Sequence, residues 1–101
     1  MKKCVLGIDV GTSGTRAIIV DEHGRILAST TEEHEPFTSP KIGWAEQHPD
    51  DWWRAAAIAL RKAIAPSGIR PENIAAVGFS GQMHGAVMLD GTDRVVRPAL
   101  I

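Results

Sequence analysis

Short apolar runs, each ended by a glycine-containing polar turn, make up the first third of the chain. They cover residues 5–10, 15–20 and 25–33, and the turns between them lie at 11–14 and 21–24. The runs have the length and the β-branched content of strands, although the third fades into polar residues. Each connection is too short for a crossover helix, so neighbouring strands should pair antiparallel. The chain is therefore predicted to open with a three-stranded antiparallel meander.

A helical pattern follows a loop at residues 36–43, which holds two prolines and a glycine. Pro49 stands where a first helical residue belongs, and acidic residues at 50 and 51 suit a first turn. The segment 66–68, Pro-Ser-Gly, should end the helix. Between these limits, apolar side chains recur at helical spacing and predict one buried stripe: Trp53, Ala56, Ala57, Leu60 and Ile64.

The last third of the chain alternates again between apolar runs and turns. Residues 74–79 predict a fourth strand, which is entered from the helix and can therefore run parallel to the first. After a polar loop at 80–85, two more strands are expected at 86–89 and 95–101, around a turn at Asp90-Gly91. The whole pattern predicts an α/β fold with a meander, one helix and then further strands, as one small domain or one piece of a larger one.

The composition excludes several classes of protein. The chain has 101 residues, of which 44% are hydrophobic and 23% charged, and its net charge is −1. It has no charge surplus for binding nucleic acid or an anionic membrane, and no apolar stretch near the roughly 20 residues of a membrane span. Cys4 is the one cysteine, which rules out an internal disulfide and suits a reducing compartment. Asp9 interrupts the first apolar run, which indicates a strand rather than a signal peptide, and we expect a cytoplasmic protein.

The first turn carries candidate phosphate chemistry within the segment GIDVGTSGTR. Glycines such as Gly11 let backbone N–H groups approach a phosphate closely, and Thr12 and Ser13 add hydroxyl donors. Asp9 could hold Mg²⁺ through water, and Arg16 could offset charge on a transferring phosphoryl group. The segment has neither a Walker A lysine nor a dinucleotide fingerprint. From spacing alone, a plain hairpin with a polar turn explains it equally well.

The loop GQMHG, residues 81–85, is a second candidate site. Gln82 and His84 could hydrogen-bond sugar hydroxyls, and Met83 could line a wall. For an isolated histidine, an ordinary hydrogen-bonded loop residue is the simpler interpretation. The histidines and the single cysteine show no metal-ligand spacing.

Three tryptophans lie near these segments. Trp53 is predicted to belong to the core, and Trp52 either to the core or to a contact with the preceding loop. Trp44 either packs its own loop in place or flanks a sugar, because sugar faces stack on indole rings.

With these segments located, the sequence resembles the FGGY carbohydrate kinases from GIDVGTSGTRAIIVDEHG through GWAEQHPDDWW and AAVGFSGQMHGAVMLD to RPALI. GIDVGTSGT resembles the first phosphate motif of the family, which the wider actin-like ATPases share. GQMHGAV is more specific and resembles the substrate loop of the members that phosphorylate D-xylulose. The matching loop of glycerol kinases carries Arg-Glu, and that of gluconate kinases has Met-His without the preceding Gly-Gln.

The resemblance implies a ribonuclease-H-like, actin-like ATPase fold, of which residues 1–101 form the front part of the first domain. It implies ATP and Mg²⁺ as cofactors and D-xylulose as the sugar. Asp9 resembles the family aspartate near Mg²⁺ and the transferring phosphate, and the turn with Arg16 resembles the nucleotide-phosphate contacts. Met83 and His84 resemble the residues that touch the ketose. Gly14 stands where glycerol kinases carry a hydroxyl, so that contact is missing here.

Members of the family are several times longer than this chain, and their downstream general base and adenine-binding domain have no counterpart in it. We therefore expect the chain alone to be inactive. We also expect it to self-associate, because its strands look apolar on both faces. Two alternatives stay open: another sugar or polyol kinase of the family, such as a gluconate kinase, or a non-catalytic module that binds phosphate or sugar.

Overall fold

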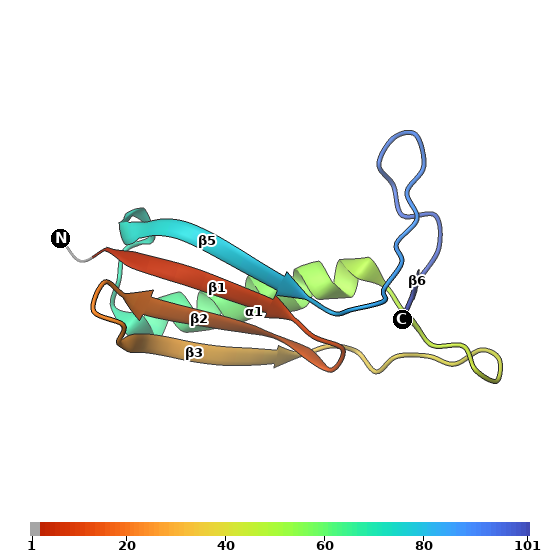
Figure 1. The fold of residues 1–101 in the computed structure, drawn as a ribbon, viewed down its shortest axis with the longest axis horizontal. Helices are drawn as coiled ribbons and strands as arrows, with labels where there is room; N and C mark the ends of the chain where they lie inside the picture. The colour runs from red at the N-terminus through yellow and green to blue at the C-terminus, as the bar shows by residue number, and fades with distance from the viewer. Residues whose placement is uncertain (1–2) are drawn as a thin grey trace.

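The computed structural model describes residues 3–101 as a four-stranded sheet with one long helix on one face (Figure 1). The sheet has the order β3-β2-β1-β5, with β1 antiparallel to β2 and parallel to β5. The predicted meander and the parallel fourth strand are therefore confirmed. The elements are β1 (Cys4–Val10), β2 (Gly14–Asp21), β3 (Ile26–Glu33), β4 (Glu46–Gln47), α1 (Pro49–Ser67), the 3₁₀ helix η1 (Pro71–Asn73), β5 (Ile74–Gly81) and β6 (Ala99–Leu100).

Alternation along the strands gives the sheet two different faces. Side chains at every second position of β1 and β2 turn toward α1 and are buried: Cys4, Leu6, Ile8, Ala17 and Ile19. The residues between them turn to the opposite face, which no helix covers within residues 3–101. The core is thus a thin apolar layer between one face of the sheet and α1.

Helix α1 begins and ends at the predicted residues. The ring of His48 caps its first turn by accepting from the Asp50 amide at 3.2 Å, and Pro49 is the first helical residue. At the other end, Gly68 adopts φ 73°, a left-handed conformation that stops the helix at little steric cost.

The buried stripe of α1 differs from the predicted one. The side chains that pack fully against the sheet are Ala55, Ala59 and Ala63, whereas Trp53 is 78% exposed. The prediction that Trp53 belongs to the core is therefore wrong. The helix lies so close to β3 that the Thr30 hydroxyl donates to the Ala59 carbonyl at 2.6 Å. Only small side chains fit at such a distance. Ala56, Leu60 and Ile64 of the predicted stripe pack against the same core but stay partly exposed, on the flank of the helix.

That flank borders an open apolar groove of about 760 Å³. Trp53, Ala57 and Leu60 of α1 line it together with Val77 and Phe79 of β5. Helix α1 packs mainly on β2 and β3, and so it leaves the β5 side of the same face uncovered. Phe79 is accordingly 75% exposed. The groove is the unfilled part of the core layer, and its walls offer little polar chemistry.

The segment after β5 forms only a short part of the two predicted strands, β6. Instead of strands at 86–89 and 95–101, it has isolated bridges between Ala86 and Leu100 and between Leu89 and Val95, and the short β6 pairs with β4. The chain leaves the sheet after β5 and turns back beside the start of α1 (Figure 1). Its apolar residues therefore never meet the edge of the sheet. The predicted turn at Asp90 is confirmed, since its carboxylate accepts from the amides of Thr92 and Arg94.

No helix within residues 3–101 is long and apolar enough to cross a membrane.

Candidate functional site

Asp9 lies near the end of β1 on the sheet face that points away from α1. Arg16 of β2 and Ser80 of β5 are its register partners on either side, so the three residues share this face. The Ser80 hydroxyl donates to Asp9 Oδ1 at 2.7 Å. Two residues back along the strands, the paired Gly7 and Gly78 help to line a hollow of about 340 Å³, where they add no side chains of their own. This smaller hollow, and not the apolar groove, holds an exposed carboxylate beside a guanidinium.

The turn at residues 11–14 uses its carbonyls to hold itself to the protein. The Thr12 carbonyl accepts from Gln47 Nε2 at 2.6 Å and from His34 Nδ1 at 3.2 Å. The Ser13 carbonyl accepts from the His34 amide at 2.9 Å. By contrast, the amides of Thr12 and Ser13 have no acceptor within residues 3–101, and both residues are exposed. The turn therefore leaves the amides of Thr12 and Ser13 available to a phosphate.

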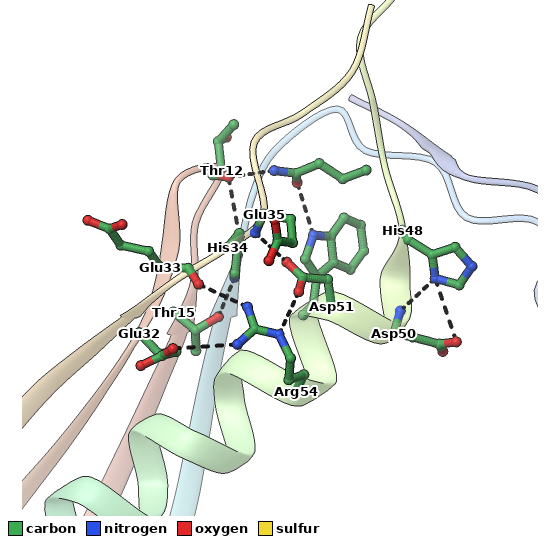
Figure 2. A network of polar contacts seen from close by, with 12 residues as sticks. Thr12, Thr15, Glu32, Glu33, His34, Glu35, His48, Asp50, Asp51 and Arg54 are labelled. Atoms are coloured by element: carbon green, nitrogen blue, oxygen red, sulfur yellow. Dashed lines mark hydrogen bonds and ion pairs between the residues drawn. The ribbon is translucent and has the colours of Figure 1, made fainter.

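His34 supports the turn from its buried side. The residue is 7% exposed, and its ring spans from the Thr12 carbonyl to the Thr15 hydroxyl, which lies 2.7 Å from Nε2 (Figure 2). A carbonyl can only accept, so Nδ1 donates to Thr12, while the hydroxyl of Thr15 can either donate to Nε2 or accept from it. One side chain thus fixes both ends of the turn.

The chain on either side of His34 is held by the first turn of α1. Asp51 accepts from the Glu35 amide at 2.8 Å and from Arg54 Nε at 2.7 Å. Arg54 donates in addition to the Glu33 carbonyl at 3.0 Å (Figure 2). The first turn of α1 therefore holds in place the segment that carries His34, and so it also supports the turn at residues 11–14.

The contacts of the Asp51 carboxyl with Glu35 and Arg54 are predicted to make the stability of the fold depend on pH. Burial alone would raise its pKa, but the hydrogen bonds from Arg54 and Glu35 and the charge of Arg54 outweigh it, so the pKa lies below its ordinary value. A lowered folded-state pKa stabilises the fold above the unfolded value of about 4, and this contribution is lost as the pH falls through the folded pKa. The stability advantage of wild type over Asp51→Asn should therefore be full at pH 6 and shrink on acidification below about pH 4.

Urea unfolding at several pH values measures that difference. Asp93→Asn provides the control, because Asp93 is exposed and Asn tolerates its left-handed φ of 63°. A difference for Asp51→Asn that stays constant between pH 6 and pH 3 would contradict the prediction.

The loop at residues 81–85, which is predicted to contact the substrate, contacts the turn at residues 11–14 (the phosphate turn) through Gln82. Its Oε1 accepts from the Thr12 hydroxyl at 3.4 Å, and its Nε2 donates to Gln47 Oε1 at 3.2 Å. Met83 and His84 are exposed, and His84 adopts a left-handed φ of 63°. The structure thus brings Thr12 and Gln82 together, and leaves the next two loop residues at the surface.

Two of the tryptophans lie beside this region. Trp52 donates from Nε1 to Gln47 Oε1 at 2.9 Å, so it is turned toward the preceding loop. The ring of Trp44 lies against the cations of Lys41 and Arg97, at 4.9 and 5.9 Å from its centroid. This contact supports the interpretation of Trp44 as a residue that holds its loop in place.

Sequence reasoning missed three polar residues of this site: Ser80, His34 and Gln47. A signal existed for Ser80, because a hydroxyl at the end of a strand parallel to β1 falls beside the end of β1. His34 and Gln47 stand singly in irregular segments, and nothing in their spacing shows that both reach the Thr12 carbonyl.

The donor set fits Mg²⁺ held mainly by water and phosphate. Residues 3–101 contain no group of three or more histidines, cysteines and carboxylates that could enclose a metal. Mg²⁺ usually keeps several waters and takes one or two carboxylates together with substrate phosphates. The exposed Asp9 carboxylate, held on one oxygen by Ser80, can serve as such a ligand through water.

The sheet, turn and helix are arranged as in solved sugar kinases. The structure of xylulose kinase from Rhodospirillum rubrum matches with a TM-score of 0.87 and 29% identity, over 97% of this chain and 20% of that one. Gluconate kinase from Lactobacillus acidophilus matches with a TM-score of 0.82 and 28% identity, over 99% and 20%. The chain has the actin-like ATPase fold of these kinases.

The match extends to the family. The N-terminal domain of the FGGY family of carbohydrate kinases corresponds to residues 4–101, and the chain belongs to this family. The xylulose kinase of Bacillus subtilis (strain 168) is 37% identical over 99 residues, and the glycerol kinase of Methylorubrum extorquens (strain PA1) is 40% identical over 90. These alignments cover 98% and 89% of this chain but 20% and 18% of the relatives. The chain thus spans about a fifth of their length.

Proposed function

We propose that the chain is the front part of a kinase that transfers the γ-phosphoryl group of MgATP to the 5-hydroxyl of D-xylulose. The observation that carries this proposal is the turn at residues 11–14. Its Thr12 and Ser13 amides have no acceptor within residues 3–101, and its Thr12 hydroxyl contacts Gln82. Donors for phosphate are thus placed beside a loop with groups for a sugar. Membership of the FGGY family supports the pairing of these two ligands.

Phosphoryl transfer depends mostly on positioning and electrostatics. MgATP, when bound, supplies the group to be transferred. Thr12 and Ser13 would donate to its phosphate oxygens. Gly11, whose amide donates to the Gly14 carbonyl at 2.9 Å, would let a phosphate approach the turn closely, and Arg16 would offset negative charge there. Asp9 would orient Mg²⁺ through water.

Gln82, Met83 and His84 would hold the sugar. Two of these three are exposed at the surface of the described chain, where a ligand can reach them. The loop sequence GQMHG supports D-xylulose, as do the xylulose kinases among the relatives. Glycerol and gluconate kinases also match this chain, so another sugar or polyol of the family is the alternative.

An ATP-consumption assay on the full-length protein, with D-xylulose, D-ribulose, gluconate and glycerol as substrates, tests the proposal. A clear preference for D-xylulose in kcat/KM is expected. A preference for another substrate would support the kinase activity but refute D-xylulose as the substrate. No activity with any of them would favour a non-catalytic phosphate- or sugar-binding module.

The remaining parts of the proposal concern the whole protein. We propose that the general base and the adenine site lie outside residues 1–101, so that the 101-residue chain alone transfers no phosphoryl group. We also propose a cytoplasmic homo-oligomer that binds neither nucleic acid nor membrane. The uncovered apolar groove beside Phe79 supports self-association of the 101-residue chain, and its net charge of −1 supports the lack of polyanionic partners.

A further inference from the structure

The buried side-chain amide of Gln47 connects the phosphate turn (residues 11–14) to the loop proposed to hold the sugar (residues 81–85, the sugar loop). The residue is 6% exposed. Its Nε2 donates to the Thr12 carbonyl at 2.6 Å, and its Oε1 accepts from Trp52 Nε1 at 2.9 Å and from Gln82 Nε2 at 3.2 Å. Thr12 belongs to the turn after β1, Trp52 to α1 and Gln82 to the loop after β5, so the amide connects three separate parts of the fold.

The orientation of this amide is fixed by its partners. The Thr12 carbonyl can only accept and the Trp52 indole can only donate, so a flipped amide would lose both hydrogen bonds. Burial makes that loss costly, because no water replaces the missing partners. The direct contact between Thr12 and Gln82, at 3.4 Å, is long for a hydrogen bond. The stronger connection between turn and loop therefore runs through Gln47.

The short strand that carries Gln47 is itself held on both sides. β4 pairs with β6, and the neighbouring Glu46 forms an ion pair with Arg97 and a backbone pair with Thr38. The Ala45 carbonyl accepts from the Ile101 amide at 3.0 Å. Gln47 thus lies on a segment that these contacts hold in place. A displacement of Gln82 would be transmitted to the turn rather than absorbed by movement of β4.

We propose that Gln47 is a positioning residue that couples the two ligand sites, so that sugar bound at the 82–84 loop tightens binding of the nucleotide at the 11–14 turn, and the reverse. This inference rests on the proposed function. By linkage, the two ligands must raise each other's affinity by the same factor. A purely structural role for Gln47 would affect stability and leave that factor unchanged.

The test compares dissociation constants in the full-length protein. Calorimetry gives the affinity for a non-hydrolysable MgATP analogue with and without D-xylulose, or the sugar that the panel identifies, and the ratio is the coupling factor. We expect about fivefold or more in wild type, the usual lower range for coupled sites, and a factor near one in Gln47→Met, which keeps the length of the side chain and removes its hydrogen bonds. Gln47→Glu keeps the acceptors for Trp52 and Gln82 but removes the donor to Thr12, so it should lose the coupling as well.

Thr30→Val is the matched control. It removes a part-buried hydrogen bond, to the Ala59 carbonyl, at a place with no contact to either loop, and should lower stability without changing the coupling factor. If Gln47→Met folds poorly, Gln47→Glu interrupts the same connection with a side chain that keeps its acceptor for Trp52, and loss of coupling there supports the inference. An unchanged factor in folded Gln47→Met or Gln47→Glu, or no coupling in wild type, would overturn it. Absence of kinase activity in wild type would instead refute the proposed function.

Discussion

Replacement of Asp9 by Asn should lower kcat of the full-length protein by about 10²-fold or more, a loss typical of removing one charge-stabilising group. The Asn side chain has nearly the same shape, and its Oδ1 can still accept from Ser80, which lies 2.7 Å from Asp9 Oδ1. What disappears is the negative charge beside Arg16, which would orient Mg²⁺ and the transferring phosphate. The residues proposed to hold the sugar, 82–84, make no hydrogen bond to Asp9 within the described chain. The affinity for the sugar should therefore stay within about twofold of that of wild type.

Steady-state kinetics and calorimetric titration with D-xylulose together measure both parts of this expectation. Glu22→Gln is the matched control, because it removes a carboxylate from the exposed turn between β2 and β3, at the opposite end of the strands. It should leave kcat unchanged. Normal turnover in Asp9→Asn would remove Asp9 from the mechanism, whereas a large loss of sugar affinity would show that the substitution disturbs the whole site.

The parts of the fold that the sequence predicts well depend on neighbouring residues. The meander follows from runs joined by turns too short for any crossover, and the start of α1 follows from Pro49 and the acidic residues after it. The predicted phosphate turn lies where the pattern puts it, between the first two strands. Such local rules hold because they involve contacts within a few residues, which the rest of the molecule rarely overrides.

The errors arise where distant segments decide the outcome. The apolar residues at 86–89 look like a strand, but β5 leads them away from the sheet edge. They form only isolated bridges, between Ala86 and Leu100 and between Leu89 and Val95. Likewise, Gln47 and His34 become part of the site only because β4 and the segment after β3 both pass beside Thr12. Their roles depend on the path of the chain in space, which no spacing in the sequence records.

The alanine stripe of α1 leads to the second large expected effect, on stability. Ala59→Leu should destabilise the 101-residue chain by about 1–3 kcal/mol, because added methylenes in a packed core force side chains and backbone apart. Ala59 has no exposed surface, and its carbonyl accepts from Thr30 at 2.6 Å, so the helix cannot take a larger side chain there without moving off β3. Urea unfolding measures the loss, and faster hydrogen exchange in β3 would locate it.

Ala57→Leu makes the same chemical change two residues earlier and provides the control. Ala57 lines the open apolar groove of about 760 Å³, where a leucine finds space and apolar neighbours such as Phe79. It should therefore alter stability by no more than about 0.5 kcal/mol. The periodicity of large apolar residues alone predicts the reverse, since it assigns Ala57 to the buried stripe and omits Ala59. Equal losses from the two substitutions, or a larger loss from Ala57→Leu, would mean that α1 packs through its large residues and that the orientation described here is wrong.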